Sequence, residues 1–156
     1  ENFASTTKLH DYTVVSKYVK STVEMFDECY MLKELPEHFN LNSPSLIDVS
    51  GTFWACTSLK SLPEGFYVGE NVEKITWLFD GSAIEGVVDI RTNKLSAPGA
   101  YSYALGSYKQ SNGSYNASSK ITGVIGTDYA DEIWATKDSW SYRLVNPTQE
   151  FLDSIK

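Results

Sequence analysis

Apolar residues recur along the first half of the chain with the spacing of one face of a helix. Steps of three, four and three residues connect the members of each of three stripes. Apolar positions at that spacing predict amphipathic helices of about three turns. The stripes are Val19, Thr22, Phe26 and Cys29; Leu46, Val49, Phe53 and Cys56; and Val72, Ile75, Phe79 and Ser82. The pattern therefore predicts one short helix in each of three successive segments.

The first two stripes belong to a segment that occurs twice in the sequence. Residues 26–39 align with residues 53–66 at an offset of 27, and eight of the fourteen aligned positions are identical. A fixed period of roughly 20 to 50 residues is typical of stacked repeats, in which each unit covers the apolar face of its neighbour. After each helix we expect a short extended segment, ended by Pro36 or Pro63 because proline has no N–H to donate.

The repeated segments also carry a resemblance. Residues 25–29 read Met-Phe-Asp-Glu-Cys, residues 52–56 read Thr-Phe-Trp-Ala-Cys, and residues 78–82 read Leu-Phe-Asp-Gly-Ser. With the leucines and aromatic residues that follow, this pattern resembles the BspA-like leucine-rich repeat family of bacterial surface proteins. The match covers about residues 19–90, and Glu28 and Ala55 stand where that family usually has glycine. The resemblance implies a binding or adhesion scaffold on a bacterial surface, and similar repeats occur in phage tail or host-recognition proteins.

From the repeat and the resemblance we predict an α/β fold, a leucine-rich-repeat-like solenoid. Its coils of about 26–27 residues would each contain a short helix and a short strand, followed by an irregular C-terminal part. Residues 1–156 would form a single domain, with an N-terminal cap at 1–18, three regular coils at 19–95, and a degenerate coil and C-terminal cap at 96–156. Residues 84–90 are expected to form a better strand than the earlier coils, and residues 128–136 a short helix.

Two side-chain arrangements follow from this register. Phe26, Phe53 and Phe79 should stack and be almost fully buried, since each lies on the apolar stripe of its coil. Cys29 and Cys56 should be buried free thiols, because packed helices lie about 8–10 Å apart, whereas a disulfide needs Cα atoms roughly 4.4–6.8 Å apart. A disulfide between them is the alternative.

The net charge and the lack of known catalytic motifs argue against several classes of function. The formal net charge is −7 and the isoelectric point is near 4.8, which argues against nucleic acid or an anionic membrane as the main partner. No window approaches 18 consecutive apolar residues, so we expect no membrane insertion. The usual phosphate-loop, zinc-protease and serine-hydrolase motifs are missing from the sequence. We therefore predict no catalytic residues, no cofactor and no metal.

A segment rich in tyrosine supplies the candidate contact surface. Fifteen of the 21 residues from Gly99 to Ser119 are Tyr, Ser, Gly or Asn, a composition typical of antibody contact loops. Tyrosine and tryptophan also dominate binding hot spots. The alternative is that these rings pack in the core. The predicted partner-binding residues are Tyr101, Tyr103, Tyr108, Tyr115, Trp134 and Trp140.

The expected function is a non-enzymatic recognition or adhesion module that binds a protein or glycan on a host or cell surface. It would be extracellular or on the surface of a bacterium, and a chain that begins at Glu1 could be a piece of a longer parent through which oligomers form. The alternatives are a phage virion component, in the tail or in host recognition, and a structural spacer in an assembly. The weakest alternative is a glycoside hydrolase that uses Asp131 or Glu132 beside Trp134.

Overall fold

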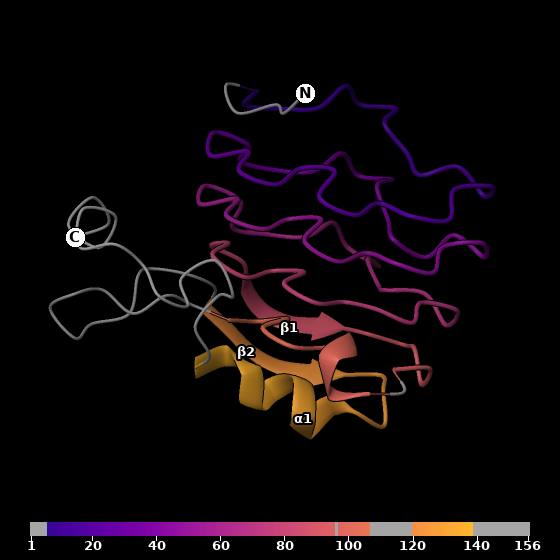
Figure 1. Ribbon diagram of the computed structural model, residues 1–156. Helices are drawn as coiled ribbons and strands as arrows, with labels where there is room; N and C mark the ends of the chain where they lie inside the picture. Colours follow the sequence, from indigo (N-terminus) through magenta and orange to yellow (C-terminus); the bar gives the residue numbers. More distant parts are fainter. Residues whose placement is uncertain (1–5, 96, 107–119, 139–156) are drawn as a thin grey trace, which may run out of the picture.

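The computed structural model describes residues 6–95, 97–106 and 120–138. In chain order its elements are β1 (Glu85–Asp89), the 3-10 helix η1 (Pro98–Ala100), β2 (Lys120–Ile125), α1 (Ala130–Ala135) and the 3-10 helix η2 (Thr136–Asp138). Figure 1 shows successive passes of the chain lying one above another, from the N-terminal end down to β1, β2 and α1.

The predicted α/β solenoid of helix-plus-strand coils is wrong. In the described part of the chain the one α-helix, α1, has six residues and lies after the predicted coils, and the two strands have five and six residues. Residues 19–84 contain turns and isolated parallel bridges but neither helix nor strand. All three predicted helices are therefore absent.

The bonding of the stripe residues explains why no helix forms. A helical N–H donates to the carbonyl four residues earlier. Here the N–H of Phe26 donates instead to Thr52 O at 3.0 Å, and the N–H of Phe53 donates to Leu78 O at 3.1 Å. Each of these bonds joins one pass of the chain to the next. The spacing of three, four and three residues thus results from tight turns whose N–H groups face a neighbouring pass.

Left-handed residues shape those turns. Glu24, Gly51 and Trp77, at successive equivalent positions, have φ of 54°, 63° and 58°. The residues four positions later also have a positive φ. Glu28, Ala55 and Gly81 have φ of 57°, 57° and 74°. A positive φ interrupts a right-handed helix. The glycines at 51 and 81 were the sequence signal against helices, since glycine disfavours a helix interior by about 1 kcal/mol relative to alanine.

The predicted phenylalanine stack is confirmed. The ring of Phe53 lies between those of Phe26 and Phe79, with centroid distances of 6.0 and 5.9 Å and interplanar angles of 16° and 3°. Phe26 is 3 % exposed and the other two rings are fully buried. Apolar side chains at equivalent positions of successive passes therefore form the centre of the core.

Cys29 and Cys56 are free and buried, as predicted. The reason given for this, wide helix spacing, does not hold, because the two passes are hydrogen-bonded to each other. The Cys56 thiol donates to Phe26 O at 3.0 Å. The side-chain contact with Cys29, together with burial, raises the pKa of the Cys56 thiol, and a protonated buried thiol reacts slowly.

The strand expected at 84–90 is present as β1. It pairs in parallel with β2, with Glu85 opposite Lys120 and Asp89 opposite Ile125, and the register shifts between Gly86 and Val87. Val88 of β1 faces the core, whereas Val87 faces outward.

The short helix expected over 128–136 is also present, as α1, which lies against β2 (Figure 1). Ile133 of α1 is fully buried. Just after α1, the Thr136 hydroxyl accepts a hydrogen bond from the N–H of Leu105 at 3.0 Å. Thr136 therefore ties the turn at 101–106 to the C-terminal side of α1. None of the helices in the described ranges has the length and apolar composition needed to cross a membrane.

Candidate binding groove

Two of the predicted contact residues come together in the structure. Tyr101 and Tyr103 line an open hollow of about 300 Å³ with Pro98, Ser102 and Thr136. Tyr101 is half-buried against the core, and its ring lies 6.0 Å from that of Tyr129. Tyr101 therefore contributes to packing as well as to the surface of the hollow.

Trp134, the one other predicted contact residue in the described ranges, does not line this hollow. Trp134 lies on α1, half-buried against the core, with the Lys137 ammonium 4.8 Å from its ring centroid. One face of this indole is thus already in contact with a cation. Tyr108, Tyr115 and Trp140 lie outside the described residues, as do most residues of the predicted C-terminal cap.

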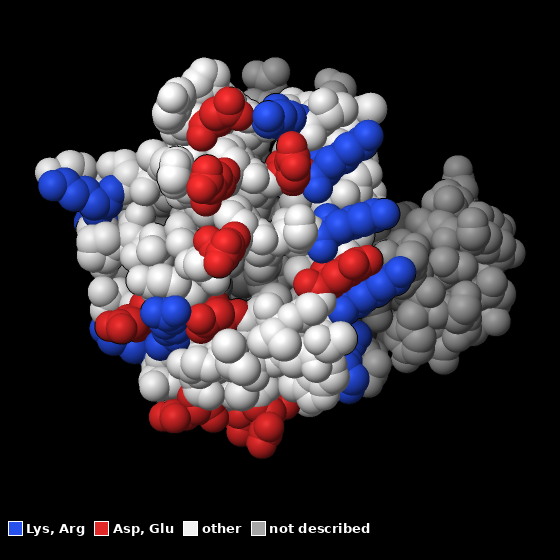
Figure 2. All heavy atoms as spheres, turned by 180° about the vertical axis from the view of Figure 1, so that it is seen from behind, with Lys and Arg blue, Asp and Glu red and all other residues white. Residues whose placement is uncertain are grey.

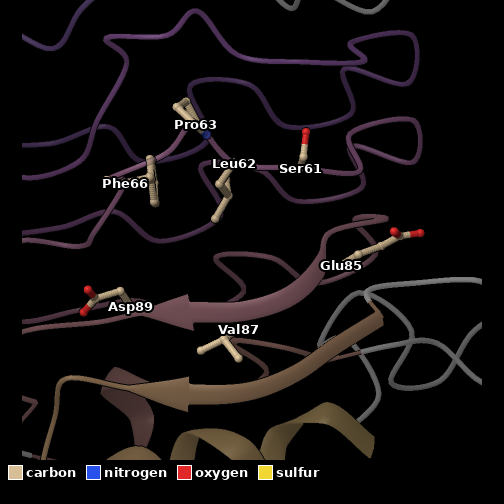
Figure 3. A pocket seen from close by; sticks show the side chains of 8 residues that line it. Ser61, Leu62, Pro63, Phe66, Glu85, Val87 and Asp89 are labelled. Carbon is tan, nitrogen blue, oxygen red and sulfur yellow. The ribbon is translucent and has the colours of Figure 1, made fainter.

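A narrower hollow lies between β1 and the preceding pass of the chain (Figure 3). Its volume is about 240 Å³. We call it the β1 groove, and it is lined by Ser61, Leu62, Pro63, Gly65, Phe66, Glu85, Val87 and Asp89.

The groove forms because the two passes differ in length. The N–H of Glu85 donates to Lys60 O and the N–H of Val68 donates to Asp89 O, both at 3.0 Å. Between these two bonds, nine residues of one pass (60–68) oppose five residues of β1 (85–89). The longer segment must therefore arch away from the strand. Gly65, with φ of 77°, makes the turn that brings it back.

Strand alternation presents three side chains to the groove. Successive side chains of a strand point to opposite faces, so Glu85, Val87 and Asp89 share one face and Val88 points into the core. Val87 is 56 % exposed. Gly123 of β2 lies opposite Val87 in the register, so no side chain covers Val87 from that position. Figure 3 shows Glu85 and Asp89 at opposite ends, with Val87 between them.

Both acids of the groove have basic neighbours. Arg91 forms an ion pair with Asp89 at 3.1 Å and lies 3.7 Å from the ring centroid of Tyr67. The hydrogen bond from Arg91 to Asp89 raises the pKa of the arginine. Lys120 lies 4.0 Å from Glu85. The groove thus has an apolar centre and a rim of both charges.

Charged side chains on this part of the molecule follow the repeat. Lys33 and Lys60 are exposed at equivalent positions of successive passes, and so are Glu37 and Glu64. Figure 2, which views the molecule from behind, shows a row of acidic side chains that runs across the passes and, beside it, a row of mostly basic side chains. Repetition of the sequence therefore produces rows of like charge.

The acids of the groove do not have the spacing of a glycosidase pair. Glu85 and Asp89 are four residues apart on one strand, which places their Cα atoms about 13 Å apart, whereas glycosidase carboxyl groups are roughly 5 to 9.5 Å apart. Asp131 and Glu132 are both exposed on α1. Among the described residues, no group of three or more His, Cys, Asp or Glu side chains could hold a metal ion.

Sequence reasoning missed the groove, although a signal was present. Residues 84–90 were expected to form a strand, and alternation within it places Val87 on the same face as Glu85 and Asp89. Single exposed apolar residues are common on protein surfaces, so this signal becomes specific only with the two acids on either side of Val87. The arch of residues 60–68 gave no such signal, because it depends on how two passes align.

Comparisons with known proteins found no relative: no family model matches the chain, and neither does any curated protein or solved structure.

Proposed function

We propose that the chain is a non-enzymatic recognition module that binds a protein segment in the β1 groove. The observation that carries this proposal is the exposed Val87, which lies between Glu85 and Asp89 in a hollow with a rim of both charges. An apolar centre surrounded by a polar rim is the usual anatomy of a protein–protein contact. A partner would insert an apolar side chain over Val87 and place polar groups on the two acids.

The size of the groove favours a side chain over a small molecule. Its volume of about 240 Å³ lies below the roughly 300 to 1,000 Å³ of small-molecule sites. Its one aromatic lining residue, Phe66, is 7 % exposed, so the groove offers no open ring face on which a sugar could stack. The β1 groove therefore fits a protein partner better than a glycan partner.

The proposal also includes where the protein is found. The sequence resemblance to BspA-like repeats favours an extracellular protein on a bacterial surface, and phage host recognition is the variant of this proposal. The repeated passes would serve as a rigid support that holds the groove in place. The tyrosine-rich segment would add a second contact region through Tyr101 and Tyr103 at the open hollow.

A selection from displayed peptides tests the proposal. The whole chain is immobilised and presented with a library of linear peptides and, separately, with a glycan array. We expect retained peptides to share an apolar residue flanked by charged residues at alternate positions. Val87→Glu should weaken their binding by about tenfold or more, because a buried apolar contact is lost and an unpaired charge is introduced.

Val14→Glu is the matched control, since Val14 is 58 % exposed and lies outside the groove. It should bind the peptides as the unchanged chain does. Equal effects of the two substitutions would exclude the groove. Retention of glycans alone would replace the protein partner by a glycan, and retention of neither would favour a structural spacer.

A further inference from the structure

The first of the stacked turns has an open edge. In the later turns, the carbonyls of Asp48, Ser50 and Thr52 accept hydrogen bonds from the N–H groups of the turn before them. The equivalent carbonyls of the first turn belong to Ser21, Val23 and Met25. Within the described residues, no N–H donates to any of these three. We call residues 21–25 the N-terminal edge.

Two apolar side chains at this edge, Val23 and Met25, are exposed where a further turn of the stack would cover them. Thr52 and Leu78, the equivalents of Met25 in the next two turns, are fully buried. Met25 is 36 % exposed and Val23 is 44 % exposed. The described residues before the edge do not cover it, because Lys8 forms its bridge with Glu34 and the carbonyl of Val15 accepts from Ser43.

The polarity of the edge excludes pairing with the same edge of a second copy. Two copies that met edge to edge would bring one row of carbonyls against another, with few N–H donors between them. An occupant that pairs with the edge is therefore an extended segment with N–H groups at alternate residues facing the three carbonyls.

Charge at the edge indicates the chemistry of that segment. Glu24, Asp27 and Glu28 are acidic, whereas the equivalent residues of the next turn are Gly51, Trp54 and Ala55. Glu24 is exposed and lies against Gly51 of the next turn, where an added Cβ would be 3.2 Å from Glu24 Cγ. A segment paired with the edge would lie about 4.8 Å from this turn, on the side opposite to Gly51. Basic residues in the segment would therefore gain from attraction to Glu24.

We infer that the N-terminal edge binds an extended basic segment of a partner protein, which adds to the stack as a further parallel pass. Strand addition of this kind takes its affinity from main-chain hydrogen bonds and its specificity from side chains. Here the main-chain acceptors are the carbonyls of Ser21, Val23 and Met25, and the side-chain contacts are with Val23, Met25 and Glu24. The edge is separate from the β1 groove, so each can be tested without the other.

The probe is a synthetic peptide that copies the sequence of the chain's own second turn. It spans residues 46–55 with lysines added at both ends, and its N–H groups at 49, 51 and 53 are those that donate to Lys74, Thr76 and Leu78 in the native stack. Binding of the labelled peptide to the whole chain is measured by fluorescence anisotropy. We expect saturable binding, and a peptide methylated on the nitrogens of Gly51 and Phe53 should bind about ten- to thirtyfold more weakly, since two hydrogen bonds are lost.

Substitutions in the chain complete the test. Met25→Lys should weaken the binding of the basic peptide, whereas Val14→Lys and Val87→Glu should leave it unchanged; thermal unfolding verifies that each variant is folded. No saturable binding of the parent peptide, or equal binding of the methylated peptide, overturns the inference. Self-association of the chain in sedimentation velocity that Met25→Lys removes would overturn it in favour of a second copy.

Discussion

The ring of Phe53 lies almost parallel to the ring of Phe79, with centroids 5.9 Å apart and an interplanar angle of 3°. Phe53 also contacts the rings of Phe39 and Phe66 edge to face, at 6.2 and 6.4 Å. One fully buried side chain thus joins three passes of the chain. Its removal would leave a cavity that the hydrogen-bonded backbone around it cannot easily fill.

Phe53→Ala should therefore lower the free energy of unfolding by about 3 to 5 kcal/mol. Urea titration followed by tryptophan fluorescence measures the loss. Val87→Ala is the control, because Val87 is 56 % exposed and surface substitutions usually change stability by less than about 0.5 kcal/mol. A loss below about 1 kcal/mol for Phe53→Ala would contradict the importance of the stack.

A second prediction concerns a buried polar pair. The indole Nε1 of Trp54 donates to the carboxylate of Asp80 at 3.0 Å, and Asp80 is fully buried. Hydrogen bonds to charged groups contribute roughly 1.5 to 3 kcal/mol. A double-mutant cycle with Trp54→Phe and Asp80→Ala, each of which removes the bond, should give a coupling energy in that range, measured by urea denaturation. Additive effects of the two substitutions would show that the bond contributes little.

The sequence predicted which side chains of successive passes pack against one another, but it predicted little of the backbone conformation. The 27-residue offset placed Phe26, Phe53 and Phe79 together, because the same apolar position recurs in each pass. The helices were wrong, because spacing alone does not say where an N–H donates. In these turns alternate N–H groups donate to the next pass, and left-handed residues such as Gly51 reverse the local direction of the chain.

The candidate site was less predictable than the core. The strand at 84–90 was expected, but the β1 groove needs the arch of residues 60–68 across from it, which depends on the relative lengths of two passes. The tyrosine-rich composition pointed to a different region. There the structure brings Tyr101 and Tyr103 to one hollow and leaves Trp134 packed against the core.

The buried thiols give a prediction about pH. The contact with Cys29 and burial raise the pKa of Cys56 above the ordinary value of 9.0, so above about pH 9 the unfolded chain loses a proton that the folded chain keeps. This contribution to stability is fully present below about pH 9 and decreases at higher pH, by about 1.4 kcal/mol per pH unit. Urea titrations from about pH 8 to about pH 10.5 should show a smaller decrease for Cys56→Ala than for the unchanged chain. Equal slopes would mean that the thiol also ionises in the folded chain.

The last prediction compares two glycines that share a left-handed backbone but differ in their surroundings. Gly65 has φ of 77°, and an added Cβ would meet no atom within 4 Å. Gly126, just after β2, has φ of 87°, and an added Cβ would lie 2.5 Å from Asp89 Oδ1 and 3.1 Å from Ile90 O. Gly65→Ala should cost about 1 to 2 kcal/mol, the strain of a left-handed alanine. Gly126→Ala should cost more, because it also pushes on the backbone of Ile90, whose N–H donates to Ile125 O at 2.9 Å and helps to hold β1 beside β2. Thermal and urea unfolding of the two variants measure the difference, and equal losses would show that the end of β1 yields to accommodate the new methyl group.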